Sequence, residues 1–495
     1  MTTVLGINPE QDGFSAAVVQ DGKVVSAIEQ FKIREHWLTT DHALLPEGAV
    51  QTALALAGVA LSDVDVVAFI GDVVSAERII PHIRRLFHGH PRIEPVDYRT
   101  AQVMAAFYGS PFDRAVVLSL GRGAESSSTF IALCHGLRID IEEAPDRYQT
   151  IGKVYERISN VLGFHQRTAS KVSWLGTSGQ PELRGIDELL RDIDVVPPQN
   201  VAASLQAWTN EMVIGLAEDS CKRHNVSGIC VTGPLAENPL LIHALEQHFG
   251  NDHVFVPPAP GKESLSIGAA LVHARREARP AAELCFTYPA LGPEFSDCQI
   301  KSELDNCKLI CSFFPGVDAL IESTCKTLTE GGLVGWFQGR CEFGHRALGF
   351  RSILANPFTP YINENINRFL KHREDFHPFV ISVAAESASE YFEEIGANAR
   401  TISSVYAIKD TSRNLFSNFL IQNRYVRVHT VSSADNHLFW ALLQKMQTAT
   451  GHPLLINSSF NLPNEPLVMT PRDAIRTFYA SGLDVLAIGR FLLSK

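Results

Sequence analysis

Residues 115–134 read AVVLSLGRGAESSSTFIALC: an apolar run, a turn rich in Gly and Ser, and a second apolar run. Short apolar runs around turn residues predict two buried strands joined by a polar loop. The pattern occurs once before, at TVLGI (3–7), SAAVV (15–19) and VVSAI (24–28), the last two joined by Gln20-Asp21-Gly22-Lys23. Asp-Gly supplies the positive φ of a tight hairpin turn. Two such units about a hundred residues apart indicate an internally duplicated α/β domain.

Apolar side chains at three- and four-residue spacings over 201–224 predict an amphipathic helix that ends at Asn225. The strand GICV (228–231) follows, and then the turn Thr232-Gly233-Pro234. Farther along, a Pro-rich strand end turns at Gly261 into a helix of small residues, SIGAALV. Backbone amides and the positive end of a helix can meet an anionic ligand at such a turn.

The composition excludes several classes of protein. Of the 495 residues, 45% are hydrophobic and 20% charged, which is typical of a globular chain with two or three domains. The net charge of −11 argues against a nucleic-acid binder that relies on bulk positive charge. Nine cysteines without a CxxC pair, and an N-terminus unlike a signal peptide, predict a cytoplasmic protein with reduced thiols and no membrane span.

A change of composition around 282–315 predicts a domain boundary. We expect an α/β domain over 1–282, a connector with a short helix over 283–315, and a second α/β domain over 316–495. In the second domain, LVGWFQ, FVISVAAE and PLLINSSFN read as strands, and INENINRFLK and DAIRTFYASG read as helices. The second domain therefore has more strand character than the first.

The densest polar segment is GRCEFGHRALGFRS (339–352). Arg340, Arg346 and Arg351 stand on a loop broken by glycines, and each planar guanidinium can hold two phosphate oxygens at once. Glu342 is expected to orient one of these groups. An exposed salt-bridge loop is the alternative, but the interleaved apolar residues would bury unpaired cations at a cost. The segment therefore predicts an anion site.

Two further polar groups follow along the chain. Lys371-His372-Arg373 comes after INENINRFLK, and Asn457, Ser458, Ser459 and Asn461 cluster after a buried strand. Cations can hold a phosphate while hydroxyl and amide groups bind a planar, uncharged group such as a carbamoyl. Taken separately, K-x-R and S-x-N are each typical of a solvated turn.

Taken together, GRCEFGHRALGFRSILANPF…KHREDFHPFVISV (339–383) and HPLLINSSFNLPNEPLVMTPRDA (452–474) resemble the C-terminal half of the NodU/CmcH-type O-carbamoyltransferases. These enzymes carbamoylate nodulation factors, cephalosporins and tobramycin. That half is similar to the YrdC fold, and LGPEFSD (291–297) also fits the family. The resemblance implies an α/β protein with an N-terminal duplicated actin-like domain of the ASKHA type and a C-terminal YrdC-like domain.

In that family, the YrdC-like domain makes carbamoyl adenylate from ATP and carbamoyl phosphate, and the actin-like domain passes the carbamoyl group to an acceptor. The resemblance implies an ATP-binding carbamoyltransferase of natural-product biosynthesis, such as antibiotic biosynthesis, with a small-molecule hydroxyl or amine as acceptor. Mg²⁺ can accompany the ATP, and the resemblance leaves a homodimer as one of the possible oligomeric states.

The resemblance also assigns residues. The K-x-R and S-x-N signature of the YrdC fold falls on Lys371, Arg373, Ser459 and Asn461. Together with the anion site predicted at Arg340, Glu342, Arg346 and Arg351, these residues would bind ATP and carbamoyl phosphate. Lys371 and Arg373 would be catalytic. Asp12 and Glu125 are the candidates for the base that an acceptor hydroxyl needs.

The N-terminal domain matches the family more loosely. Lys171, Gly233 and Asn238 follow the order of the family's nucleotide-binding residues. The same three could equally be a core lysine, a turn and a helix cap.

The family's metal ligands are replaced. Its two histidines fall on Tyr98 and Gln102, and its aspartate falls on Lys262. Phenol, amide and ammonium groups are poor ligands for a divalent ion, so we expect no iron site of the family type.

Two hypotheses follow for the N-terminal domain. In the first, Arg99 or Lys262 supplies the positive charge that the metal lends to the reaction in the family. In the second, the domain no longer performs the transfer. The protein would then be a non-catalytic or acyl-adenylate-forming paralogue that binds nucleotide and supports a biosynthetic partner.

Overall fold

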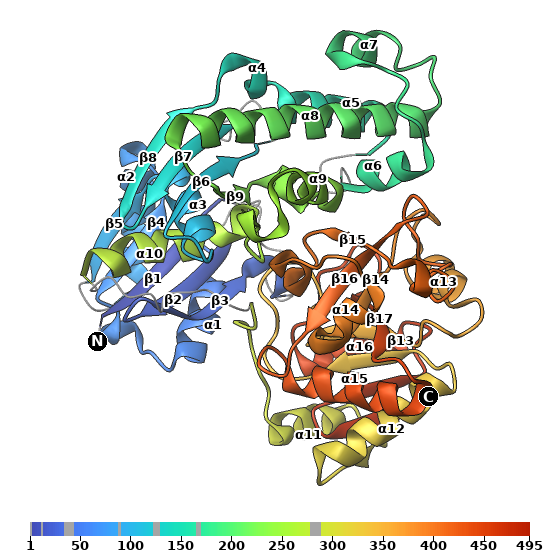
Figure 1. Cartoon of the computed structure of the whole chain (residues 1–495). Helices are drawn as coiled ribbons and strands as arrows, with labels where there is room; N and C mark the ends of the chain where they lie inside the picture. The colour runs from blue at the N-terminus through green and yellow to red at the C-terminus, as the bar shows by residue number, and fades with distance from the viewer. Residues whose placement is uncertain are drawn as a thin grey trace. The chain divides into compact units, whose positions relative to one another are not determined.

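The computed structural model describes residues 2–10, 13–33, 44–87, 91–121, 129–164, 170–277 and 289–495. The chain divides into two compact units, Met1–Gly292 and Pro293–Lys495, and each combines helices with mixed sheets (Figure 1). The helix α11 (Asp297–Asn306) and the strand β11 (Ser312–Phe313) fall in the segment expected to be a connector, and they belong to the second unit.

Two five-stranded sheets of the same design make up the first unit. Their strand orders are β3-β2-β1-β4-β5 and β8-β7-β6-β9-β10, with antiparallel pairs up to the central strand and parallel pairs after it. The predicted internal duplication is therefore confirmed by the topology. The strands are β1 (Thr3–Asn8), β2 (Ser15–Gln20), β3 (Lys23–Glu29), β4 (Val66–Ile70), β5 (Arg92–Val96), β6 (Arg114–Ser119), β7 (Phe130–His135), β8 (Arg138–Glu143), β9 (Gly228–Thr232) and β10 (Val254–Phe255).

Local sequence signals explain where several of these elements end. The β2–β3 hairpin turns at Asp21 and Gly22, whose φ angles are +46° and +80°, as Asp-Gly predicts. The helix predicted over 201–224 is α8 (Pro198–His224), and Asn225 ends it in the left-handed conformation. The remaining helices are α1 (Glu47–Ala57), α2 (Val73–Leu86), α3 (Tyr98–Phe107), α4 (Asp146–Gln149), α5 (Ile151–Val161), α6 (Ser170–Leu175), α7 (Gly185–Arg191), α9 (Pro239–Phe249) and α10 (Leu265–Glu277).

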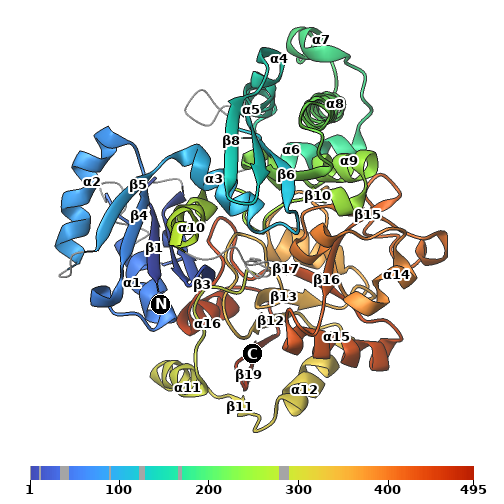
Figure 2. The same ribbon diagram turned by 60° about the vertical axis from the view of Figure 1, so that its left-hand side comes forward.

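The small residues of α10 allow it to pack directly on backbone. A Cβ atom on Gly268 would lie 1.9 Å from the carbonyl oxygen of Ala101 in α3. A Cβ atom on Gly6 in β1 would lie 1.9 Å from the carbonyl oxygen of Ser266. Only glycine fits at either contact, and α10 lies beside β1 and α3 as a result (Figure 2). The packing also positions the turn that enters α10.

The second unit is built on one nine-stranded sheet with the order β11-β19-β18-β12-β13-β17-β14-β16-β15. The strands and helices expected from the sequence of this unit are present. Besides β11, the strands are β12 (Val334–Phe337), β13 (Arg351–Ala355), β14 (Val380–Ala384), β15 (Val405–Ala407), β16 (Tyr425–Val431), β17 (Leu454–Ser459), β18 (Val485–Ile488) and β19 (Phe491–Ser494). Besides α11, the helices are α12 (Val317–Thr329), α13 (Ile362–Glu364), which continues as a π-helical turn over Asn365–Leu370, α14 (Ala388–Tyr391), α15 (His437–Thr450) and α16 (Pro471–Tyr479).

Alternation along these strands separates two apolar cores on the two faces of the sheet. One core contains Ile353, Ile381, Val428 and Ile456. The other contains their strand neighbours on the opposite face and buries them against helices α12 and α15; its sheet residues include Leu354, Ala384, Val431 and Leu455. Each face of the sheet therefore has its own hydrophobic cover.

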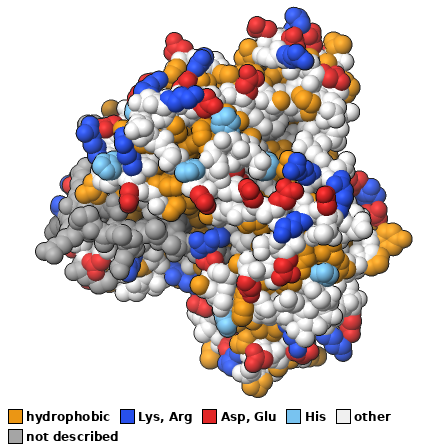
Figure 3. Space-filling view, in the orientation of Figure 1, with side chains coloured by type: hydrophobic (Ala, Val, Ile, Leu, Met, Phe, Trp, Pro, Cys, Tyr) orange, Lys and Arg blue, Asp and Glu red, His pale blue; other side chains and the backbone are white. Residues whose placement is uncertain are grey.

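The surface of the described residues carries charges of both signs. Lys and Arg side chains are interspersed with Asp and Glu on the face shown in Figure 3. Within the described part of the chain, every helix is too short or too polar to cross a lipid bilayer.

Candidate functional site

One end of a sheet face in the second unit is polar. Strand pairing places Ser352 beside Ser459, Ser382 beside His429, and Val380 beside both Arg427 and Asn457. Paired residues project to the same face. We call this the polar sheet face and define it by Ser352, Ser382, Arg427, His429, Asn457 and Ser459. It continues the face that α12 and α15 cover farther along the same strands.

The residues of the K-x-R and S-x-N signature meet at the edge of the polar sheet face, although 88 residues separate the two parts. The Lys371 ammonium contacts the backbone oxygen of Ser459, and it lies 2.6 Å from Asn461 Oδ1 and 2.9 Å from the Asn461 backbone oxygen. Burial lowers the pKa of Lys371 well below its usual range, and the neighbouring charge of Arg373 lowers it further. An anion placed here would stabilise the charged form of Lys371.

Three guanidinium groups, those of Arg346, Arg373 and Arg427, form what we call the arginine cluster. Arg346 Nη1 donates to the Thr401 carbonyl oxygen and to Ser403 Oγ, each at 2.9 Å. Arg373 Nε donates to Asn367 Oδ1 at 2.5 Å. These contacts hold the first two guanidinium groups in place.

The members of the arginine cluster repel one another. Burial and the charges of Arg346 and Arg373 lower the pKa of Arg427 to about 9, and burial lowers that of Arg373 to about 10. Both of these groups stay charged at neutral pH. The Glu374 carboxylate opposes the shift of Arg373, and buried like charges are costly unless counter-charges join them. The cluster therefore favours an anion with several oxygens.

The loop over 339–350 is held by one carboxylate. Glu342, which is fully buried, accepts hydrogen bonds at Oε1 from the backbone amides of Leu348, Phe350 and Arg351 at 2.8, 3.0 and 3.1 Å. We expected Glu342 to orient a guanidinium group; its hydrogen bonds organise backbone, and its charge also opposes the lowering of the pKa of the Arg351 guanidinium by burial. Glu342 fixes the backbone path of the loop that carries Arg346.

A close backbone approach locks the same loop. Gly349 has a φ of +84°, and a Cβ atom there would lie 2.1 Å from the ring of Phe439 in α15. Its carbonyl oxygen accepts from Trp336 Nε1 and from Asn436 Nδ2, each at 3.0 Å. Only glycine combines this φ with this contact, so the loop has one conformation available beside α15.

Arg351 differs from the expectation. Strand alternation turns Arg351 to the face opposite the polar sheet face. On that opposite face its guanidinium lies 3.6 Å from the ring centre of Phe337. Its Nη atoms donate to the backbone oxygens of Gln338, Phe350 and Pro293. With these donors occupied, Arg351 is a structural residue and is not brought to the cluster. Arg340 lies near Glu294, and burial lowers its pKa.

In the first unit, the predicted nucleotide-binding residues have structural partners. Asn238 caps α9, with Oδ1 accepting from the amides of Leu240 and Leu241, and Nδ2 donating to Gln206 Oε1. Gly233 has a φ of +88°, and its amide donates to the Pro260 oxygen at 2.8 Å. Lys171 lies in α6. The cap and the turn match the alternative reading of these residues, and the candidate bases Asp12 and Glu125 lie outside the described residues.

The residues at the family's metal positions do not fit a divalent ion. Lys262 Nζ lies 3.2 Å from Glu10 Oε2, so an ammonium group stands where the family has a carboxylate. Gln102 Oε1 accepts from Ser119 Oγ at 3.1 Å. Burial and the carboxylates of Glu10 and Glu263 raise the pKa of the Tyr98 phenol, which keeps it protonated. We derive no step through a metal at this place.

Arg99 and Lys262 can now be compared. Arg99 is paired with Glu143 and lies 5.2 Å from the ring centre of Phe130. Lys262 belongs to the turn that enters α10, and its backbone oxygen accepts from Asn8 Nδ2 at 2.8 Å. The turn fixes Lys262 beside the first loop of the duplicated fold.

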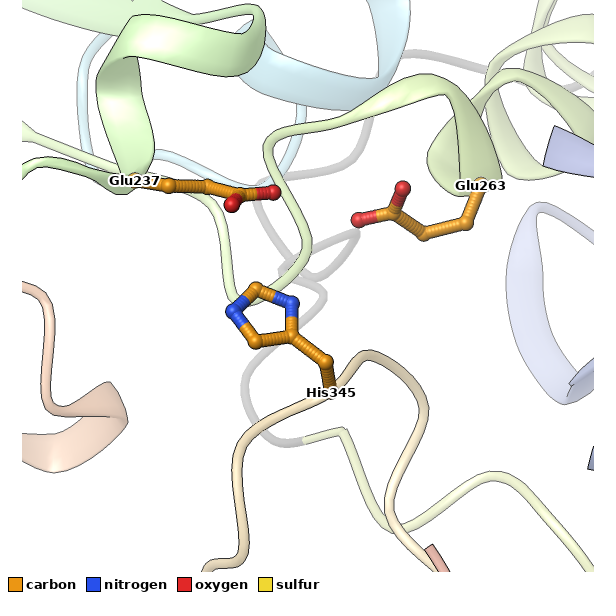
Figure 4. Close-up of side chains that lie close together, drawn as sticks. All are labelled: Glu237, Glu263 and His345. Carbon is orange, nitrogen blue, oxygen red and sulfur yellow. The ribbon is translucent and has the colours of Figure 1, made fainter. Parts of the chain in front are cut away.

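Glu237 and Glu263 are acidic groups of this unit that no sequence motif marked. Their carboxylates point toward each other, with oxygens within 4.8 Å (Figure 4, which also draws His345 of the second unit). Burial and the charges of Glu237 and Glu29 raise the pKa of Glu263. A raised pKa makes a carboxylate a stronger base.

Arg427 and His429 are residues of the polar sheet face that no sequence motif marked. They stand two residues apart in YVRVHTV, the sequence of β16. Polar residues at a spacing of two in an otherwise apolar strand indicate one polar face, and that signal would have found both.

Known proteins are similar to the second unit alone, to the first unit alone, or to most of the chain. Residues 325–495 match the family model described as "Carbamoyltransferase C-terminus". The chain is 26% identical to nodulation protein NolNO of Sinorhizobium fredii, over 97% of this chain and 78% of that protein. It is 28% identical to nodulation protein NolO of Bradyrhizobium diazoefficiens, over 81% of this chain and 79% of that protein. Among solved structures, HypF of T. kodakarensis is similar over 56% of this chain and 47% of that one, at 11% identity and a TM-score of 0.42, too weak a likeness to carry an argument.

Repulsion within the arginine cluster predicts opposite effects on stability and on anion binding. Arg427→Gln removes one like charge, so we expect the melting temperature of the ligand-free protein to rise by about 2–4 °C. Pyrophosphate should raise the melting temperature of the wild type, and we expect at least half of that rise to be lost in the Arg427→Gln variant. Differential scanning calorimetry measures both quantities.

The matched control is Arg368→Gln, because Arg368 is exposed and paired with Asp375. Exposed ion pairs contribute little, so this variant should leave both quantities unchanged. An Arg427→Gln protein that is less stable than the wild type and keeps the full pyrophosphate effect would contradict the repulsion.

Proposed function

Because this chain belongs to the NodU-type carbamoyltransferases, we propose that it activates carbamoyl phosphate with ATP and transfers the carbamoyl group to a small-molecule hydroxyl or amine. The observation that carries the proposal is the arginine cluster beside Lys371: Arg373 adds its charge to both Lys371 and Arg427. Carbamoyl phosphate and the triphosphate of ATP are the polyanions that such a group of cations would bind.

The cluster would act by neutralising charge as two anions approach. Carbamoyl phosphate and ATP repel each other, and cations fixed before they bind stabilise the charge of the transition state without rearrangement. Arg346 and Arg373 are anchored by Ser403 and Asn367, as such preorganisation requires. Mg²⁺ would accompany the ATP and share the charge of its phosphates.

The reaction proposed for the second unit balances in two steps. Water cleaves carbamoyl phosphate to carbamate and inorganic phosphate. A carbamate oxygen then attacks the α-phosphorus of ATP, the bond from that phosphorus to the bridging oxygen breaks, and pyrophosphate leaves. The product is carbamoyl adenylate, a mixed anhydride that reacts readily with nucleophiles.

In the first unit, the acceptor oxygen or nitrogen would attack the carbamoyl carbon, AMP would leave, and a base would take the acceptor's proton. Lys262 is the cation that we propose in place of the family's metal. It is held by Glu10, and Arg99 is engaged by Glu143. A protonated lysine can stabilise the phosphate of departing AMP as a point charge. Natural-product biosynthesis, as in the resembling enzymes, is the setting that we propose for the acceptor.

Exchange of labelled pyrophosphate into ATP tests the activation step. We expect exchange that depends on carbamoyl phosphate in the wild type and falls at least about 100-fold in Lys371→Met, because a fixed charge at the reacting phosphates is lost. The control Lys326→Met changes a lysine that is 73% exposed on α12 and should exchange at the wild-type rate. Absence of exchange in the wild type, with ATP still bound, would refute the proposed activation.

Metal analysis tests the assignment of Lys262. We expect the purified protein to contain far less than one iron per chain, and calorimetric titration with Fe²⁺ to show no saturable site, because an ammonium group repels the ion. The control is the triple variant Tyr98→His, Gln102→His, Lys262→Asp, which restores two imidazoles and a carboxylate and should bind the ion. One tightly bound iron per wild-type chain would show the assignment to be wrong.

A further inference from the structure

The polar sheet face contains a histidine that the cation binding described above does not use. His429 is fully buried on β16, two residues after Arg427 and on the same face. Its ring stacks against Phe439 at 6.1 Å between centroids. Burial lowers the pKa of His429 to about 3, so its imidazole is neutral beside the arginine cluster. A buried neutral imidazole offers one donor and one acceptor.

Two contacts determine which nitrogen of His429 carries the proton. Ser382 Oγ lies 3.0 Å from Nδ1, and Asn457 Nδ2 lies 3.4 Å from the same atom. An amide nitrogen can only donate, so Nδ1 accepts and the proton resides on Nε2. His429 therefore presents an N–H group at Nε2.

The orientation of the Asn457 amide is fixed in the same way. Its Nδ2 also donates to the Ala347 carbonyl oxygen at 3.0 Å, next to Arg346 of the cluster. The amide oxygen, Oδ1, must then face the other way. Asn457 is 3% exposed, so this oxygen is a buried acceptor.

Both remaining atoms lack a protein partner. Among the described residues, His429 Nε2 and Asn457 Oδ1 are buried and make no hydrogen bond. A buried polar group without a partner costs about 1–3 kcal/mol. One is a donor, the other is an acceptor, and their side chains touch at Nδ1 and Nδ2. A planar ligand group with an acceptor and a donor on one carbon offers the kind of partner that each atom lacks.

We propose that His429 and Asn457 recognise the carbamoyl group of the substrate, with His429 Nε2 donating to its carbonyl oxygen and Asn457 Oδ1 accepting from its amino group. The inference rests on the proposed function and adds the part of the site that distinguishes the acyl group. The arginine cluster would bind the phosphate of any acyl phosphate, whereas His429 and Asn457 would recognise the acyl group attached to that phosphate. Ser382 is a positioning residue, because it holds the tautomer of His429.

The arrangement excludes a close analogue. Acetyl phosphate has a methyl group where carbamoyl phosphate has an amino group, so Asn457 Oδ1 would remain unpaired beside it. A site built to bond a substrate donor rejects an analogue without that donor, because the buried acceptor is left unsatisfied. The pair thus explains how a carbamoyl group is chosen over a similar acyl group.

Calorimetric titration of the full chain with carbamoyl phosphate and, separately, inorganic phosphate tests this role. In His429→Phe, which keeps a ring against Phe439 and loses the donor, we expect the Kd of carbamoyl phosphate to rise about 10-fold or more. We expect the Kd of inorganic phosphate to stay within about 2-fold, since phosphate needs only the cations. Retained phosphate binding also shows that the variant is folded.

Two further variants serve as controls. His429→Gln keeps a neutral N–H donor and should retain carbamoyl phosphate binding within a few-fold. His437→Phe changes a histidine of α15 that bonds Ser433 and should leave both Kd values unchanged.

The outcomes separate this inference from the proposed function. Equal changes in both Kd values for His429→Phe, or no change in either, would overturn the role of His429 and Asn457 even if pyrophosphate exchange is normal. A wild type that shows no exchange dependent on carbamoyl phosphate refutes the proposed function instead. A selective loss for carbamoyl phosphate, restored by His429→Gln, supports the inference.

Discussion

Electrostatic repulsion of Arg427 by Arg346 and Arg373 is the constraint on which the candidate site of the second unit depends. Burial and the charges of Arg346 and Arg373 lower the pKa of Arg427, so these guanidinium groups would move apart if their side chains were free. Acceptors hold two of the three groups: the Thr401 carbonyl and Ser403 Oγ accept from Arg346, and Asn367 Oδ1 accepts from Arg373. The free protein thus maintains an unfavourable arrangement that a bound anion would relieve, as is typical of a preorganised site.

The loop over 339–350 supplies the rigidity that this arrangement needs. Glu342 gathers three backbone amides, and Gly349 lies against Phe439 too closely for any side chain. Arg351 closes the base of the loop from the opposite face of the sheet. A charge held by a loop is usually less precise than one held by a strand, and these contacts remove that disadvantage for Arg346.

Short-range patterns in the sequence predicted most of the fold. The Asp21-Gly22 turn, the left-handed Asn225 and the small residues of α10 each have one local conformation or packing partner, so the duplicated sheets could be expected from them. The meeting of Lys371 with Ser459 could not, because 88 residues separate them and only the family resemblance linked them.

The errors in the predicted site have physical causes as well. Arg351 and Ser352 are neighbours in the sequence, but alternation in β13 sends them to opposite faces, which depends on a register that the sequence alone does not reveal. Asn238 was weighed as a ligand or a cap, and its hydrogen bonds to two amides of α9 identify the cap. Arg427 was overlooked because its strand reads as apolar.

A crystal structure of the full chain with bound pyrophosphate would show whether the arginine cluster binds an anion. We expect the phosphate oxygens to lie within hydrogen-bond distance, about 2.7–3.2 Å, of guanidinium nitrogens from Arg346, Arg373 and Arg427. Pyrophosphate bound elsewhere on the second unit, with the three side chains turned toward acidic neighbours, would contradict it.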